Sequence, residues 1–147
     1  MKKLSEFLSK DDKVLITNAI KSAELNTSGE IRVHIENKCK TDVLDRAAYL
    51  FEKLAMHKTE KRNGVLFYLA VKDKKFAILG DAGINKVTPD DFWEDIKETM
   101  FSHFKKEEFA KGLEQGIEMA GQQLKDHFPY QSDDINELSD EISFGNK

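Results

Sequence analysis

Residues 63–71 read NGVLFYLAV, a nearly continuous apolar run with the length of one β-strand. A strand that is apolar on both faces needs a helical layer on each side to bury it. Residues 75–80, at the end of the charged turn Lys72–Lys75, form a second short apolar run. The two runs predict a hairpin of antiparallel strands, with 64–71 as the central strand of a sheet between helices.

Upstream of this strand, residues 30–36 alternate polar and apolar side chains, which predicts a strand with one covered face. Apolar residues at intervals of three and four predict amphipathic helices over 9–25 and 42–57. The second of these helices connects the two strands as a crossover. We therefore expect strand 30–36 to run parallel to strand 64–71.

Downstream, Thr88 followed by Pro89 is typical of an N-cap and a first helical residue, so a third helix is expected to begin there. A fourth helix is expected over 106–128, where three glycines (Gly112, Gly116 and Gly121) favour close packing against a neighbour. The order α-β-α-β-β-α-α defines an α/β fold. We predict a three-layer αβα sandwich with a small mixed sheet.

The composition of the 147-residue chain bounds its function. Lys and Arg number 23 against 27 Asp and Glu, so no strong basic field favours nucleic-acid binding. The single cysteine, Cys39, has no partner for a disulfide and no zinc-ligand spacing, which favours a reducing compartment. We find neither a signal peptide nor a membrane span. A cytoplasmic location is the expectation.

Residues 130–147 differ in character from the domain over residues 1–129. They carry five acids and one lysine with little core-forming material, so we expect a flexible acidic tail. Ile135, Leu138 and Ile142 lie at helix-compatible intervals and could dock on a protein partner as an induced helix. The alternative is a solvated terminus with no role.

Several acidic residues are expected at one edge of the sheet. The predicted topology brings Glu30, Asn63 and Asp81 to this edge, and the helix expected at Thr88 would present Asp90 and Asp91 nearby. Oxygen ligands without His or Cys suit a hard cation, Ca²⁺ or Mg²⁺. The alternative, which the residues alone favour, is that Asp90 and Asp91 serve the helix dipole and Asp81 is a turn residue.

Other chemistries lack their motifs. The chain contains no GxSxG, HExxH or Walker sequence, and no GxGxxG after a strand. No motif joins any of the four histidines to Cys39 or to a serine. These observations exclude the enzyme classes that depend on those motifs.

Four blocks of the sequence, taken in order, resemble the TPM domain family. They are TSGEIRV (27–33), RNGVLFYLA (62–70), AILGDAGI (77–84) and the segment from Phe104 to Leu113. The resemblance covers residues 4 to about 128. The fold of that family, an αβα sandwich with a small mixed sheet, agrees with the prediction above.

The resemblance also implies a function. Some members are described as acid phosphatases, and some bind divalent cations near the acidic edge. Glu30 and Asp81 would be the matching positions, with Asp90 and Asp91 as further candidates.

Because the usual signal peptide and membrane anchor are missing, we expect a small bacterial cytosolic version. The first hypothesis is a module that binds a divalent cation, Ca²⁺ before Mg²⁺, and a protein partner in quality control or envelope maintenance. The alternative is a metal-assisted acid phosphatase.

Overall fold

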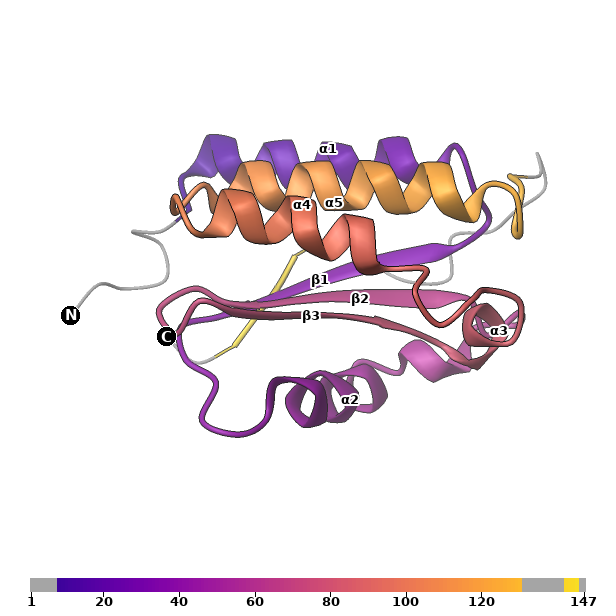
Figure 1. The fold of residues 1–147 in the computed structure, drawn as a ribbon, viewed down its shortest axis with the longest axis horizontal. Helices are drawn as coiled ribbons and strands as arrows, with labels where there is room; N and C mark the ends of the chain where they lie inside the picture. The colour runs from indigo at the N-terminus through magenta and orange to yellow at the C-terminus, as the bar shows by residue number, and fades with distance from the viewer. Residues whose placement is uncertain (1–7, 131–141, 146–147) are drawn as a thin grey trace.

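The structure is a computed structural model that describes residues 8–130 and 142–145. Helices cover both faces of a four-stranded sheet, as Figure 1 shows, with α1, α4 and α5 on one face and α2 on the other. This arrangement confirms the predicted αβα sandwich. The elements are α1 (Lys10–Glu24), β1 (Glu30–Glu36), α2 (Val43–Lys53), η2 (Met56–Lys58), β2 (Gly64–Ala70), β3 (Lys75–Gly80), α3 (Ala82–Asn85), α4 (Glu94–Phe104), α5 (Phe109–Leu124) and β4 (Ser143–Phe144).

The sheet has the strand order β3-β2-β1-β4. Strand β1 pairs parallel with β2, with Glu30 opposite Gly64, and β3 pairs antiparallel with β2, with Gly80 opposite Val65. Every residue of β2 is buried. The expectation that 64–71 would be a central strand covered on both faces is confirmed.

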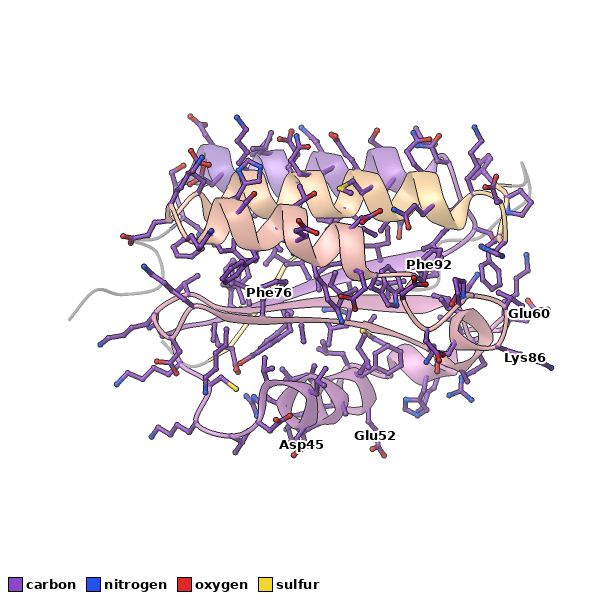
Figure 2. All side chains as sticks on the ribbon, viewed as in Figure 1. Asp45, Glu52, Glu60, Phe76, Lys86 and Phe92 are labelled. Carbon is purple, nitrogen blue, oxygen red and sulfur yellow. The ribbon has the colours of Figure 1, made fainter. Side chains whose placement is uncertain are left out.

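Strand alternation divides the core into two parts. Ile31, Val33 and Ile35 face α1 and α5, whereas Leu66 and Tyr68 face α2. Aromatic packing closes the larger part: Phe76, labelled in Figure 2, meets Phe104 of α4 edge to face with 5.0 Å between ring centroids.

Strand β1 departs from the prediction of one covered face. Its polar residues Glu30, His34 and Glu36 are buried like its apolar ones. They lie on the side of the sheet that holds α2, where hydrogen bonds and ion pairs among polar groups replace apolar packing. Alternation of polar and apolar residues therefore located the strand but did not reveal what covers its polar face.

Local sequence explains how α1 begins and how closely α5 packs against it. The Ser9 hydroxyl caps α1 by accepting a hydrogen bond from the Asp12 N–H at 3.0 Å. The Asp12 carboxylate in turn accepts one from the Ser9 N–H, also at 3.0 Å. In α5 the glycines allow close approach, since a Cβ at Gly121 would lie 2.9 Å from the Cβ of Ala23 in α1. The predicted close packing of the fourth helix is confirmed.

The third helix does not begin at Thr88. The Thr88 hydroxyl donates to the Ile84 carbonyl at 2.9 Å, so it satisfies the end of α3 instead of capping a new helix. A turn follows, with the Phe92 N–H donating to the Pro89 carbonyl at 3.1 Å, and α4 starts only at Glu94. The predicted helix start is wrong because the hydroxyl of Thr88, the expected N-cap, bonds to the preceding helical turn.

Part of the acidic tail belongs to the sheet. Residues 143 and 144 form β4 and pair parallel with His34 and Ile35. Residues 142–145 of the expected acidic tail (130–147) thus lie against β1, while residues 131–141 and 146–147 lie outside the described part of the chain, and the expectation of flexibility stays a prediction. Within that described part, every helix is too short or too polar to cross a membrane.

Candidate functional site

The predicted edge of the sheet exists. Because Glu30 lies opposite Gly64 and Gly80 lies opposite Val65, Glu30 and Asp81 flank Gly64 from its two neighbouring strands. Two strand spacings separate their Cα atoms by about 10 Å. The Glu30 N–H donates to the Asn63 carbonyl at 3.2 Å, and the Asp81 N–H donates to the Gly64 carbonyl at 2.9 Å. We call this region the loop edge: Glu30, Arg62, Asn63 and Asp81.

Asp81 is the most firmly held carboxylate of the loop edge. Its side chain is 5% exposed and accepts two hydrogen bonds from Arg62, from Nε and Nη2, each at 2.8 Å. It also caps α3 by accepting from the Ala82 N–H at 2.7 Å. The N-cap role agrees with the interpretation of Asp81 as a turn residue, and its bidentate partner Arg62 is an addition that the sequence did not predict.

Arg62 is half exposed, whereas Asp81 is nearly buried. The Arg62 side chain is 50% exposed, and the hydrogen bonds to Asp81 raise the pKa of its guanidinium. Its backbone has φ = 51°, in the left-handed region that few non-glycine residues adopt. The carbonyl of Arg62 accepts from the Gly83 N–H at 2.9 Å, and the tight contact of Gly83 with this loop leaves no room for a Cβ. The loop thus places a cation on the Asp81 carboxylate without burying it.

The remaining predicted residues do not complete a cage. Asp90 and Asp91 are exposed in the turn before α4, so they are not first-turn residues of that helix. In residues 8–130 and 142–145, no three or more His, Cys, Asp and Glu side chains gather closely enough to hold a metal ion. A cation here would need oxygen atoms of other kinds beside the carboxylates.

Such oxygens exist next to the loop edge. In the part of the chain that the structure describes, the hydroxyls of Ser28 and Thr59 are buried without a hydrogen-bond partner. Ser28 lies two residues before Glu30, and the Thr59 carbonyl accepts from the Arg62 N–H at 3.3 Å. Carboxylate, hydroxyl and carbonyl oxygens together are the donor set of a hard cation. The chemistry of these residues fits one, and its ligand geometry is not preformed.

A second polar cluster was missed by sequence reasoning. Glu36 is fully buried and accepts hydrogen bonds from Tyr68 Oη at 2.5 Å and from Arg46, through Nε at 3.1 Å and through Nη2. His34 Nε2 lies 3.3 Å from Glu36 Oε1, and its Nδ1 lies 2.8 Å from the hydroxyl of Ser143. We call Glu36 and His34 of β1, Arg46 of α2 and Tyr68 of β2 the Glu36 cluster. The signal in the sequence was that β1 carries polar residues at alternate positions although it pairs with β2, which is apolar on both faces.

Electrostatics in the Glu36 cluster follow from burial and pairing. Burial lowers the pKa of His34, and the neighbouring Glu36 opposes this only in part. Burial raises the pKa of Glu36, but hydrogen bonds from Arg46, Tyr68 and His34 outweigh it, so the net shift is downward. Burial and then the bond to Glu36 raise the pKa of Tyr68. The cluster therefore holds an ionised Glu36 beside a neutral His34 at neutral pH.

Fold and loop edge together define a small αβα domain with an acidic, arginine-paired sheet edge. A family model described as TPM domain matches residues 1–123. The chain belongs to the TPM domain family.

Solved structures agree with this assignment. The chain is similar to the BA42 protein from the psychrophilic bacterium Bizionia argentinensis, at 49% identity and a TM-score of 0.91, covering 99% of this chain and 100% of that one. Two N-terminal domains share the fold alone. One is from the cg2496 protein of Corynebacterium glutamicum, at 14% identity, a TM-score of 0.65 and coverages of 98% and 84%. The other is from a P. gingivalis protein, at 18% identity, a TM-score of 0.67 and coverages of 85% and 81%. A comparison with curated proteins finds no match.

Proposed function

We propose that this TPM domain is a divalent-cation-binding module whose cation binds at the loop edge to Asp81 and Glu30, with Asp90 and Asp91 as outer candidates. The observation that carries the proposal is the pairing of a nearly buried Asp81 with a half-exposed Arg62. A guanidinium that occupies both oxygens of a fixed carboxylate marks a position where positive charge is favourable. Because Arg62 can withdraw into water, an incoming cation exchanges with it at low cost.

The expected ion is Ca²⁺ in preference to Mg²⁺. Ca²⁺ accepts six to eight oxygens in flexible geometry, whereas Mg²⁺ demands a near-ideal octahedron. A site that draws on two carboxylates about 10 Å apart at their Cα atoms, with hydroxyl and carbonyl oxygens between, suits the more adaptable ion. Binding would follow a small rearrangement of loop 59–62.

The test is a Ca²⁺ titration followed by backbone amide NMR shifts, with two opposed variants. Asp81→Asn removes one ligand charge and should weaken Ca²⁺ binding without altering the fold. Arg62→Gln removes the competing cation and should tighten it. The matched control is Asp45→Asn, an exposed residue of α2 (Figure 2) that belongs to no part of the loop edge, and it should leave affinity unchanged. Equal affinity in all four proteins would reject the loop edge as the site.

A metal-assisted acid phosphatase is the second candidate. Arg62 favours it, because a half-exposed guanidinium beside a carboxylate suits a phosphate group. The same variant separates the two functions. In a phosphatase, Arg62→Gln should lose most of the hydrolysis of p-nitrophenyl phosphate, whereas in a binding module no hydrolysis above background is expected from either protein.

Partner binding is a further part of the proposal. We further propose a cytoplasmic role in protein quality control or envelope maintenance, in which the acidic segment 130–147 binds a protein partner. A pull-down with the full chain and with a chain ending at Pro129 checks this. Identical sets of captured proteins would reject a role for the tail.

A further inference from the structure

Residues 142–145 lie on the outer edge of β1 in the manner of a bound peptide. The ladder is two residues long, with Ser143 opposite His34 and Phe144 opposite Ile35, and it runs parallel to β1. The Gly145 N–H donates to the Ile35 carbonyl at 2.9 Å. Addition of an extended segment to a sheet edge is a common mode of peptide recognition, in which the backbone gives affinity and side chains give specificity.

Each of the three positions meets a different environment. The Ser143 hydroxyl is 2.8 Å from Nδ1 of His34. The ring of Phe144 is 39% exposed and lies under the ammonium of Lys13, 5.2 Å from the ring centroid. At Gly145 a Cβ would lie 2.3 Å from Glu36 Oε1 and 2.8 Å from His34 Nε2, so a side chain is excluded. The edge therefore selects a hydroxyl, an aromatic ring and a glycine in succession.

The floor beneath this segment is rigid and polar. Glu36 is fixed by Arg46 and Tyr68, and His34 is only 4% exposed. A buried ionic cluster is weak evidence for stability, because desolvation offsets much of its attraction. The cluster contacts Ser143 and Gly145, so it suits a role in determining which side chains can bind at these two positions.

The footprint covers only part of the free edge of β1. Towards the start of β1, the Ile31 N–H donates to the carboxylate of Glu24 at 3.0 Å, which closes that part of the edge. Towards its end, the described ladder stops where the Gly145 N–H donates to the Ile35 carbonyl at 2.9 Å. The site spans about three residues around Val33 to Ile35.

We propose that this edge of β1, with His34 and Glu36 as its floor, is a binding site for an extended segment of a partner protein with the sequence Ser/Thr-aromatic-Gly, and that residues 142–145 are its resident competitor. The partner segment runs parallel to β1 and replaces β4. Since the resident segment is tethered, it competes at high effective concentration, and partner binding in the intact chain is correspondingly weakened.

The experiment uses the full chain and a fluorescent peptide DEISFGNK, which copies residues 140–147. Gly145→Val in the protein should displace the resident segment, because its side chain would meet Glu36 and His34. If the segment covers the site nine-tenths of the time, peptide affinity should then rise about tenfold over the wild type. Amide shifts should centre on Val33 to Ile35.

The matched control places the same change in the peptide. A peptide with Val in place of its glycine should not bind the Gly145→Val protein, and one with Ala in place of its serine should bind more weakly. Should Gly145→Val prevent folding, Ser143→Ala serves instead, since it removes only the contact with His34. Absence of peptide binding to the opened protein, or equal binding of the Val peptide, would overturn the proposal. So would dimerisation of the wild type with rising concentration, because the occupant would then be a second copy.

Discussion

At the residue scale, Tyr68 ties the central strand to the Glu36 cluster. Its ring is fully buried and its hydroxyl donates to the Glu36 carboxylate at 2.5 Å. Tyr68→Phe keeps the ring and deletes one hydrogen bond to a charged group, which should lower the free energy of unfolding by about 1.5–3 kcal/mol. Urea denaturation at pH 7 measures this. Tyr49→Phe, at a ring that is 53% exposed, is the control and should change stability by less than about 0.5 kcal/mol.

His34 should make stability depend on pH. Its pKa in the folded protein lies below the ordinary value of 6.5, so the unfolded chain binds more protons between the two values. The contribution of His34 is therefore complete above about pH 6.5 and is lost as pH falls through the lowered pKa of the folded state. Glu36 has the same sign, but its pKa lies below 4.5, so its loss comes at lower pH.

Urea denaturation from pH 5 to 8 isolates the effect of His34. The wild type should become less stable below pH 6.5, and His34→Gln should show a flatter profile over this range. His127→Gln, at an exposed position, should keep the profile of the wild type. A wild-type profile retained in His34→Gln would show that another group titrates.

At the element scale, the glycines of α5 separate backbone contacts from side-chain contacts. A Cβ at Gly121 would meet the backbone of Ala23 at 3.0 Å, which cannot move without shifting α1. A Cβ at Gly116 would meet the Sδ of Met100 at 2.4 Å, the flexible part of an adaptable side chain. Gly121→Ala should therefore cost about 1–3 kcal/mol of stability by overpacking.

Gly116→Ala is the matched comparison. Alanine gains about 1 kcal/mol of helix propensity over glycine, which should offset the rearrangement of Met100. Thermal unfolding should show a clear loss of stability in Gly121→Ala and a change of less than about 1 kcal/mol in Gly116→Ala. Equal losses would mean that the α4 contact is as rigid as the α1 contact.

The elements differ in how far sequence alone could predict them. Strand β2 was predictable because an apolar run has few alternatives, and α1 because Ser9 and Asp12 form a capping box. The start of α4 was not, since whether the Thr88 hydroxyl serves the preceding or the following helix depends on where α3 ends. Strand β4 was also hidden, because two residues carry no periodicity and their pairing depends on an edge formed more than 100 residues earlier.

The same distinction applies to the candidate site. Topology placed Glu30 and Asp81 at one edge, since parallel and antiparallel pairing determine which strand ends meet. The bidentate contact of Arg62 with Asp81 depends on a left-handed backbone at Arg62, which no local pattern announces. The Glu36 cluster likewise joins β1, α2 and β2 through side-chain geometry. Sequence predicted that Glu30 and Asp81 share an edge, but it predicted neither the pairing of Arg62 with Asp81 nor the Glu36 cluster.

At the scale of the whole molecule, the two faces of the sheet have unequal protection. Three helices cover one face, while α2 and η2 cover the other over β2 and β3 (Figure 1). The polar side of β1 thus depends on the Glu36 cluster and on β4 for its cover. This asymmetry predicts that opening of the native state begins at β4 and leaves the larger core intact.

Native-state hydrogen exchange tests that order. The Phe67 amide lies in a strand paired on both sides and should exchange only by global unfolding, which costs about 5–15 kcal/mol. The Gly145 amide is held at the end of a two-residue ladder, where one or two hydrogen bonds contribute about 1–3 kcal/mol in all. Low concentrations of urea should therefore accelerate exchange at Phe67 and leave Gly145 unchanged, because detachment of β4 exposes little surface. Equal protection of the two amides, with the same response to urea, would show that β4 is an integral strand of the sheet. A partner segment could then bind only after the domain unfolds.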